Sequence, residues 1–272
     1  MLSIVCVYNN KDIFSRRLLK SLQAQTVPFE IIALDNCSGR FASAAQALNY
    51  GAEQIKSDSR YIMFAHQDIE LGSPAWLEDA EKMLDALPDF GIAGVAGKQD
   101  GKDILLTNIS DGIPPRKPGQ EIREAVTAVT LDECCAIAPR ALFQRHAFDE
   151  ALCGNWHLYV VEYCLRVIKA GLNVYILPLD LYHCSIGTLN LSYFRTLKKV
   201  MRAYGDRYPV LYTTCGCWDT RASLLSLWFL PLMKSSFYAF TGRLIASGLV
   251  PAWLQRKRSK RLKANQQQNP SP

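Results

Sequence analysis

Short apolar runs alternate with amphipathic segments along most of this chain. Residues 2–8 are almost all apolar and include β-branched side chains, which predicts a buried strand, and apolar residues then recur at helical spacing over 13–22. The alternation continues with a strand at 30–34, a helix at 42–55 and a strand at 61–65. Such alternation is typical of a parallel sheet covered by helices on both faces. The pattern therefore predicts an α/β fold that begins β-α-β-α-β.

The downstream pattern is less regular but continues the same way. We predict helices at 74–87, 139–146 and 157–170, strands at 91–97, 126–131 and 173–177, and a long loop or hairpin over the Gly-, Pro-, Asp- and Lys-rich residues 98–120. Gly171 is expected to end the helix that precedes it.

Polar side chains follow three of the predicted strands, directly where each strand ends. They are Tyr8 and Asn9, the turn Asp35–Ser38, and the triplet His66–Asp68. In open α/β sheets, ligands bind beyond the carboxyl ends of the strands. Carboxylate oxygens such as those of Asp68 can hold Mg²⁺ or Mn²⁺, and the ion then screens a nucleotide diphosphate. The sequence therefore predicts a nucleotide-diphosphate site with a metal ion.

Other nucleotide-binding classes lack their defining parts. The chain contains neither GxGxxG nor GxxxxGK[ST], which excludes a dinucleotide oxidoreductase and a P-loop NTPase. A nucleotidyltransferase of related architecture would need a glycine- and basic-rich loop after the first strand, and residues 8–10 do not provide it.

An ordered series of segments resembles glycosyltransferase family 2. SIVCVYNN is similar to the opening strand of these enzymes, LDNCSG to their first nucleotide-contacting turn, and AHQDIEL to a shortened DxD metal motif. Residues 148–187 are similar to the stretch that closes the domain in the HQD-type bacterial members. The resemblance covers roughly residues 1–205, and its strength is the order of the segments.

The resemblance implies a GT-A fold, Rossmann-like with a mostly parallel sheet, and an inverting glycosyltransferase of the hexosyltransferase type. The donor would be a nucleotide sugar, most often UDP-linked, and the acceptor a cell-surface glycan or a lipid-linked glycan. The implied nucleotide-binding residues are Val7, Tyr8, Asn9, Asp35 and Gln67, and the implied ligands of Mn²⁺ or Mg²⁺ are Asp68 and His183. We expect His66 to shape its turn, and Trp156 to pack or to stack on an acceptor sugar.

The general base departs from the family pattern. Family 2 enzymes usually carry EDxDLxLR, and alignment on Arg166 puts Val160, which accepts no proton, at the base position. An inverting transferase needs a base within hydrogen-bond reach of the acceptor hydroxyl. The remaining candidates are Glu133, Asp132, His157 and Glu162, of which we favour Glu133 or Asp132. The alternatives are a base-deficient enzyme and a non-catalytic sugar-nucleotide or glycan-binding module.

Charge divides the chain into two parts. The 272 residues carry 31 basic and 25 acidic side chains, a net charge of +6, but nine of the basic ones and no acidic one follow Asp219. Residues 1–220 therefore hold 22 basic and 25 acidic groups, a balance of −3. This balance argues against nucleic-acid binding by the folded domain.

The basic C-terminal part is interpreted as a membrane-facing appendage. We expect a GT-A domain at 1–215, amphipathic helices at 216–255 and a basic disordered tail at 256–272. No uncharged stretch there reaches the 18 residues of a spanning helix, so residues 222–263 are expected to lie on an anionic membrane surface. A helical hairpin packed on the domain is the alternative.

The cysteines and the first residues bear on the cellular location. The nine cysteines are odd in number and scattered, and the Cys134–Cys135 and Cys215–Cys217 pairs lack metal-site spacing, so we expect small buried side chains in a reducing compartment. We expect no secretory signal, because the first residues lack a basic region followed by a long apolar stretch. The expected location is cytoplasmic, peripheral on the cytoplasmic face of the inner membrane.

Overall fold

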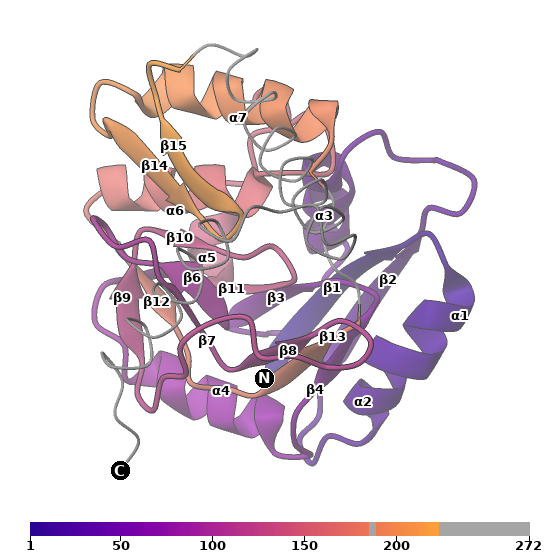
Figure 1. Cartoon of the computed structure of the whole chain (residues 1–272). Helices are drawn as coiled ribbons and strands as arrows, with labels where there is room; N and C mark the ends of the chain where they lie inside the picture. Colours follow the sequence, from indigo (N-terminus) through magenta and orange to yellow (C-terminus); the bar gives the residue numbers. More distant parts are fainter. Residues whose placement is uncertain (185–188, 223–272) are drawn as a thin grey trace, which may run out of the picture. The chain divides into compact units, whose positions relative to one another are not determined.

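A computed structural model describes residues 1–184 and 189–222 (Figure 1). The chain divides into two compact units, Met1–Ala222 and Ser223–Pro272, and the first one is described below. The predicted tail and nearly all of the predicted appendage therefore lie outside the described residues. None of the helices in the described ranges combines the length and the apolar character needed to cross a bilayer.

A seven-stranded sheet forms the centre of the first unit. In spatial order its strands are β2 (Glu30–Asp35), β1 (Leu2–Tyr8), β3 (Tyr61–Ala65), β11 (Cys135–Pro139), β5 (Phe90–Gly94), β12 (Asn173–Ile176) and β9 (Val126–Ala128). β1 pairs in parallel with β2 and β3, and β12 pairs in parallel with β5. β11 and β9 are antiparallel to their neighbours. The predicted parallel strands are present, and antiparallel β11 joins them to the rest of the sheet.

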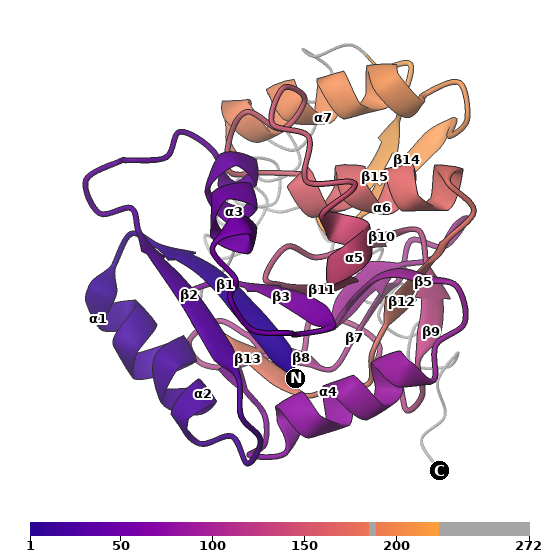
Figure 2. The ribbon, with the colours of Figure 1, turned by 180° about the vertical axis from the view of Figure 1, so that it is seen from behind.

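Helices cover both faces of this sheet, as the alternation predicted. The helices of the described residues are α1 (Lys11–Phe14), the π-helical turn η1 (Ser15–Leu19), α2 (Lys20–Gln23), α3 (Ala44–Glu53), α4 (Trp76–Asp85), α5 (Arg140–Phe143), α6 (Tyr159–Lys169) and α7 (Leu191–Tyr204). Figure 2 shows α1, α2 and α4 on one side of the sheet and α3, α5 and α6 on the other. The described part of the chain has two hydrophobic cores. Ile4 and Cys6 of β1 pack with Leu18 and Trp76 in one core, and Val5 of β1 packs in the other.

Local signals set the ends of several helices. Asn10 accepts a hydrogen bond from the N–H of Ile13 (3.0 Å) and begins α1, and Ser43 does the same for Gln46 (3.2 Å) at α3. Gly171, with φ of +84°, ends α6 as predicted.

Two predicted strands are wrong in the same way. The strand expected at 91–97 breaks at Val95 into β5 and β6 (Ala96–Lys98), and the one at 126–131 breaks at Val129 into β9 and β10 (Thr130–Leu131). β6 and β10 leave the central sheet and pair with each other, where the Cα of Gly97 packs so closely on the carbonyl oxygen of Thr130 that a Cβ would lie 2.3 Å from it. Apolar periodicity carries no information on which sheet a residue joins.

The predicted loop at 98–120 also contains regular structure. It holds β7 (Leu105–Thr107), which extends the β10–β6 pair, and β8 (Ile109–Asp111), which pairs in parallel with β13 (Leu181–His183). β13 also pairs with β4 (Ile69–Leu71), directly after the predicted metal motif. A hairpin of β14 (Val210–Thr213) and β15 (Gly216–Asp219) crosses the domain boundary predicted near residue 215.

Candidate functional site

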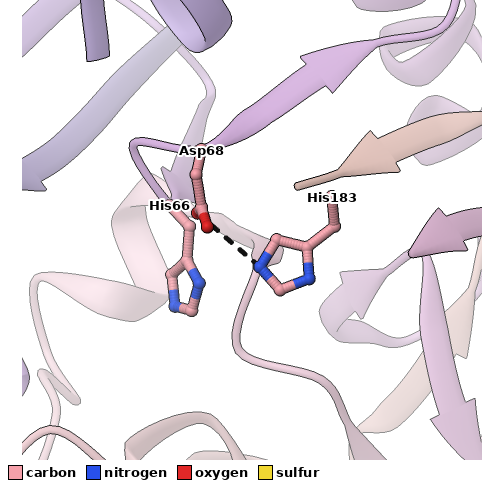
Figure 3. A group of neighbouring side chains, drawn as sticks. All are labelled: His66, Asp68 and His183. Atoms are coloured by element: carbon pink, nitrogen blue, oxygen red, sulfur yellow. Dashed lines mark ion pairs between the residues drawn. The ribbon is translucent and has the colours of Figure 1, made fainter. Parts of the chain in front are cut away.

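Two histidines and one aspartate come together at the carboxyl end of β3. His66 and Asp68 follow that strand, and His183 ends β13; one ligand atom from each side chain lies within 4.8 Å of the others. Figure 3 shows the three side chains converging, with His183 Nε2 3.6 Å from Asp68 Oδ1. Two imidazoles and a carboxylate suit Mn²⁺ and other first-row transition ions better than Mg²⁺. The donor set therefore fits a metal ion, and it unites both predicted ligands with His66.

Asp111 orients one of these histidines. The parallel pairing of β8 and β13 puts Asp111 in register with His183, and the Asp111 Oδ1 atom lies 3.1 Å from His183 Nδ1. Burial by itself would lower the pKa of His183, but its hydrogen bonds with Asp111 and Asp68 and their charges raise it to about 10. A metal ion would therefore displace a proton when it binds.

The other histidine is held in the neutral form. Burial and the nearby charge of His183 lower the pKa of His66. A neutral imidazole is the form that binds a metal. The sequence interpretation gave His66 only a turn-forming role and did not include it among the metal ligands. The two-residue spacing between His66 and Asp68 could have indicated that role.

A first cavity of about 270 Å³ opens at the carboxyl ends of β1, β2 and β3. It is lined by Val7, Asn9, Asn36, Ala44, His66, Gln67, Asp68, Trp156 and Tyr159. Gln67 Oε1 accepts hydrogen bonds from the N–H groups of Asn9 (3.1 Å) and Asn10 (3.0 Å), so it fixes the loop after β1. Three of the predicted nucleotide-binding residues, Val7, Asn9 and Gln67, thus lie in this cavity.

The other two predicted nucleotide-binding residues, Tyr8 and Asp35, are not among its lining residues. They are partners across β1 and β2, and the Tyr8 hydroxyl donates to Asp35 Oδ2 (3.3 Å). Asp35 is exposed, and the N–H of Cys37, which donates to its Oδ1 (2.8 Å), is the main cause that lowers its pKa. Its neighbour Asn36 lines the cavity instead.

A second cavity, of about 370 Å³, adjoins the first, because His66 and Trp156 line both. Its walls come from the ends of β6, β10 and β13, from β7 and β8, from the start of α6, and from the turn of the β14–β15 hairpin. Asp132, Glu133, His157 and His183 also line it. The metal-ligand set therefore lies where the two cavities meet.

The two favoured base candidates differ in their hydrogen bonds. Asp132 accepts from the N–H of Cys134 (3.0 Å) at Oδ1 and from the Thr214 hydroxyl (2.8 Å) at Oδ2. Burial would raise the pKa of Asp132, but the Cys134 N–H and the charge of His183 lower it. Glu133 Oε1, by contrast, accepts no hydrogen bond from the described residues. Glu133 therefore has one carboxylate oxygen that no hydrogen bond from the described residues holds, although that oxygen is closed to solvent.

The environment of Glu133 also changes its acidity. Burial and the negative charge of Asp132 raise the pKa of Glu133 to about 8, and the N–H groups of residues 158–160 at the start of α6 oppose that rise. Leu158, which precedes the helix, has a left-handed φ of 68°. A non-glycine residue in that region is strained, and such strain is common at functional sites.

Several solved structures of known proteins have a fold similar to that of this chain. Residues 1–349 of TarS from S. aureus, in complex with UDP-GlcNAc, give a TM-score of 0.51 at 13% identity over 74% of this chain and 65% of that one. The mannosyltransferase PcManGT from Pyrobaculum calidifontis, in complex with GDP-Man and Mn²⁺, gives 0.56 at 14% identity over 96% and 79%. GalNAc-T7 with UDP, GalNAc and Mn²⁺ gives 0.53 at 11% identity over 76% and 48%.

These are similarities of fold. The chain has a GT-A fold. It spans less than two thirds of the TarS fragment and about half of GalNAc-T7. No protein-family model and no curated protein matches the chain.

Within this GT-A fold, Glu162 lies away from both cavities. It is 1% exposed, and its carboxylate accepts from Arg166 Nε (3.2 Å), Arg166 Nη2 (3.0 Å) and the Tyr204 hydroxyl (2.6 Å). The structure therefore does not bring this predicted catalytic residue to the site. Glu162, the acidic partner of the ion pair with Arg166, is buried. Val160, at the family's base position, is fully buried.

We expect Glu162→Gln to lower the free energy of unfolding by about 1.5–3 kcal/mol, because it removes the charge that Arg166 and Tyr204 stabilise. Urea denaturation measures this, with exposed Glu53→Gln as the matched control. Unchanged stability together with lost turnover would contradict the structural role of Glu162.

The β14–β15 hairpin contributes residues to the GT-A site that the sequence interpretation did not foresee. Thr214 binds Asp132, and Cys215, expected to be buried, is exposed at the turn and lines the second cavity. A turn between two strands leaves a small side chain open to solvent, so composition alone misplaced Cys215. Cys134 and Cys135 are buried as expected.

Proposed function

We propose that this protein is an inverting, metal-dependent glycosyltransferase that uses a nucleotide-sugar donor. The observation that supports this most directly is that two cavities in a GT-A fold meet at His66, Asp68 and His183. The nucleotide would occupy the first cavity, beside Val7, Asn9 and Gln67. A divalent ion, preferably Mn²⁺, held by the three ligands would screen the diphosphate and stabilise it as a leaving group.

Glu133 is proposed as the general base. As the acceptor oxygen bonds to the anomeric carbon, the bond from that carbon to the diphosphate oxygen breaks, and the Glu133 carboxylate takes the acceptor proton. The nucleoside diphosphate leaves with the electron pair. Asp132 is proposed to act through position and charge, because both of its oxygens already accept hydrogen bonds.

The donor is proposed to be UDP-linked, as in the family that the sequence resembles. TarS in complex with UDP-GlcNAc and GalNAc-T7 with UDP have the same fold, but so does PcManGT with GDP-Man. The assignment to HQD-type members of family 2 and the choice of a cell-surface or lipid-linked glycan as acceptor stay predictions. The membrane contact through 222–263 and the cytoplasmic membrane location also stay predictions.

Incubation of the full chain with UDP- and GDP-sugars and Mn²⁺ tests the proposed reaction. We expect release of the nucleoside diphosphate. Release of pyrophosphate would instead identify a nucleotidyltransferase, and saturable binding without turnover would identify the non-catalytic module that Val160 suggests. Either result would overturn the proposal.

Asp111 gives a separate prediction for the metal site. Because Asp111 holds His183 Nδ1 and so directs Nε2 toward Asp68, we expect Asp111→Asn to weaken Mn²⁺ binding by about 10- to 100-fold. Calorimetric titration of Mn²⁺ without donor measures this, and exposed Asp100→Asn is the control from the same segment. Equal Mn²⁺ affinity in Asp111→Asn and the wild type would exclude this positioning role.

A further inference from the structure

The two cavities differ in the polar side chains that line them. Asn9, Asn36 and Gln67 supply amide groups to the first cavity, whereas no Asn, Gln, Lys or Arg among the described residues lines the second. Amide, ammonium and guanidinium groups are the side chains that can donate several hydrogen bonds at once. The second cavity is therefore poorly equipped to bind a molecule with many hydroxyl groups.

The polar side chains that the second cavity does contain are mostly occupied by protein partners. The Thr107 hydroxyl donates to the Val95 carbonyl (2.9 Å) and accepts from the N–H of Ile109 (2.9 Å). The Thr213 hydroxyl accepts from Trp218 Nε1 (2.9 Å). Two further polar pairs, Thr214 with Asp132 and His183 with Asp111, bind each other.

One polar atom differs from these. Glu133 Oε1 accepts no hydrogen bond from the described residues although it is buried. The Glu133 side chain lines the second cavity together with aliphatic and aromatic side chains, which are Leu105, Ile109, Pro118, Leu131, Trp156, Leu158, Val161, Leu189 and Tyr193. The second cavity thus combines a carboxylate that has one oxygen without a hydrogen bond from the described residues with a wall of aliphatic and aromatic side chains.

We propose that the second cavity binds an acceptor with an apolar body and a single hydroxyl, which points to Glu133. The inference rests on the proposed glycosyltransferase function, and it replaces the glycan acceptor that the resemblance implies with another class: a neutral phenol or alcohol with an aromatic or aliphatic body. Each extra hydroxyl of a glycan would lose water here without gaining a partner, which costs free energy. Burying an apolar body against these apolar side chains instead makes the free energy of binding more favourable.

Charge favours a neutral acceptor over an anionic one. Asp111 and Asp132 line the cavity, and no basic side chain other than histidine does so among the described residues. A phosphate-bearing acceptor would meet these carboxylates without a lysine or arginine partner. The volume of about 370 Å³ lies in the range of small-molecule sites.

Leu189 allows a direct test because it lines the second cavity and is partly exposed. Leu189 is 38% exposed, and Leu191, two residues later and 40% exposed, does not line the cavity. Leu189→Gln should therefore fold normally and add an amide to the wall, and Leu191→Gln is its matched control. The full chain is titrated with 2-naphthol by fluorescence, without donor and at neutral pH.

We expect 2-naphthol to bind the wild type and Leu191→Gln equally, and Leu189→Gln about 10-fold more weakly. Methyl β-glucopyranoside should not displace it. Equal binding by the two variants, or displacement by the glycoside, would overturn the inference.

A turnover assay with a UDP-sugar and Mn²⁺ separates this inference from the proposed function. We expect 2-naphthol to increase UDP release above donor hydrolysis and to yield a naphthyl glycoside by mass spectrometry. UDP release stimulated by the glycoside, or by a lipid phosphate, but not by 2-naphthol overturns the acceptor class and leaves the glycosyltransferase proposal standing. Binding of 2-naphthol without any donor turnover overturns the glycosyltransferase proposal and leaves only the ligand class of the cavity.

Discussion

Glu133→Gln is expected to reduce kcat by about 10²- to 10⁴-fold, the usual contribution of a general base. The substitution preserves the shape of the side chain but removes its ability to accept the acceptor proton. The Glu133 side chain lines the second cavity, and its Oε1 accepts no hydrogen bond from the described residues. Nucleoside-diphosphate release at saturating donor and Mn²⁺ measures the loss.

The pH dependence of kcat/KM provides a second test of Glu133 as the base. Burial and the charge of Asp132 raise the pKa of Glu133 to about 8, so the carboxyl is protonated below that pH and cannot accept a proton. In the wild type, kcat/KM should therefore rise with pH up to about 8 and then level off. Glu133→Gln should lack this limb.

Exposed Glu124→Gln is the control for Glu133→Gln, since it makes the same chemical change outside both cavities. Its kcat and pH profile should match those of the wild type. A Glu133→Gln variant that keeps kcat within a factor of about three would show that Glu133 is not the base.

Asp68→Ala is expected to abolish the stabilisation that UDP and Mn²⁺ together give the wild type. Asp68 is the only carboxylate of the three-residue ligand set, so its removal leaves two histidines to hold the ion. A ligand present at about 100 times its Kd stabilises a folded protein by about 2.7 kcal/mol, and that increment should disappear. Thermal melting with Mn²⁺, UDP, both and neither measures it.

Asp58→Ala is the control for Asp68→Ala, because Asp58 is exposed and precedes β3 at its other end. It should keep the full increase in Tm. A full increase in Asp68→Ala as well would contradict the assignment of Asp68 to the metal site.

Much of the site could be predicted because parallel strands end at the same edge of a sheet. The apolar periodicity located β1, β2 and β3, and the polar residues that follow them then had to lie near one another. Asn9, Gln67 and Asp68 were placed in this way, and the predicted ligand His183 lies 3.6 Å from Asp68.

The remainder depends on pairing between distant segments, which periodicity does not encode. Asp111 and His183 are 72 positions apart, and Thr214 and Asp132 are 82 apart. The short strands that bring them together, such as β8 and β13, have three residues each, too few to show a period. Glu162 was aligned with the later, more structural acid of the family motif, and in the structure Arg166 and Tyr204 hold it.

Anomalous diffraction from a crystal containing Mn²⁺ and UDP tests the central claim most directly, because it locates the ion without reference to activity. We predict one manganese peak within bonding distance of His66, Asp68 and His183, with UDP in the cavity beside Asn9 and Gln67. UDP bound there without a peak at these three residues, or a peak at Asp132 and Glu133 instead, would contradict it.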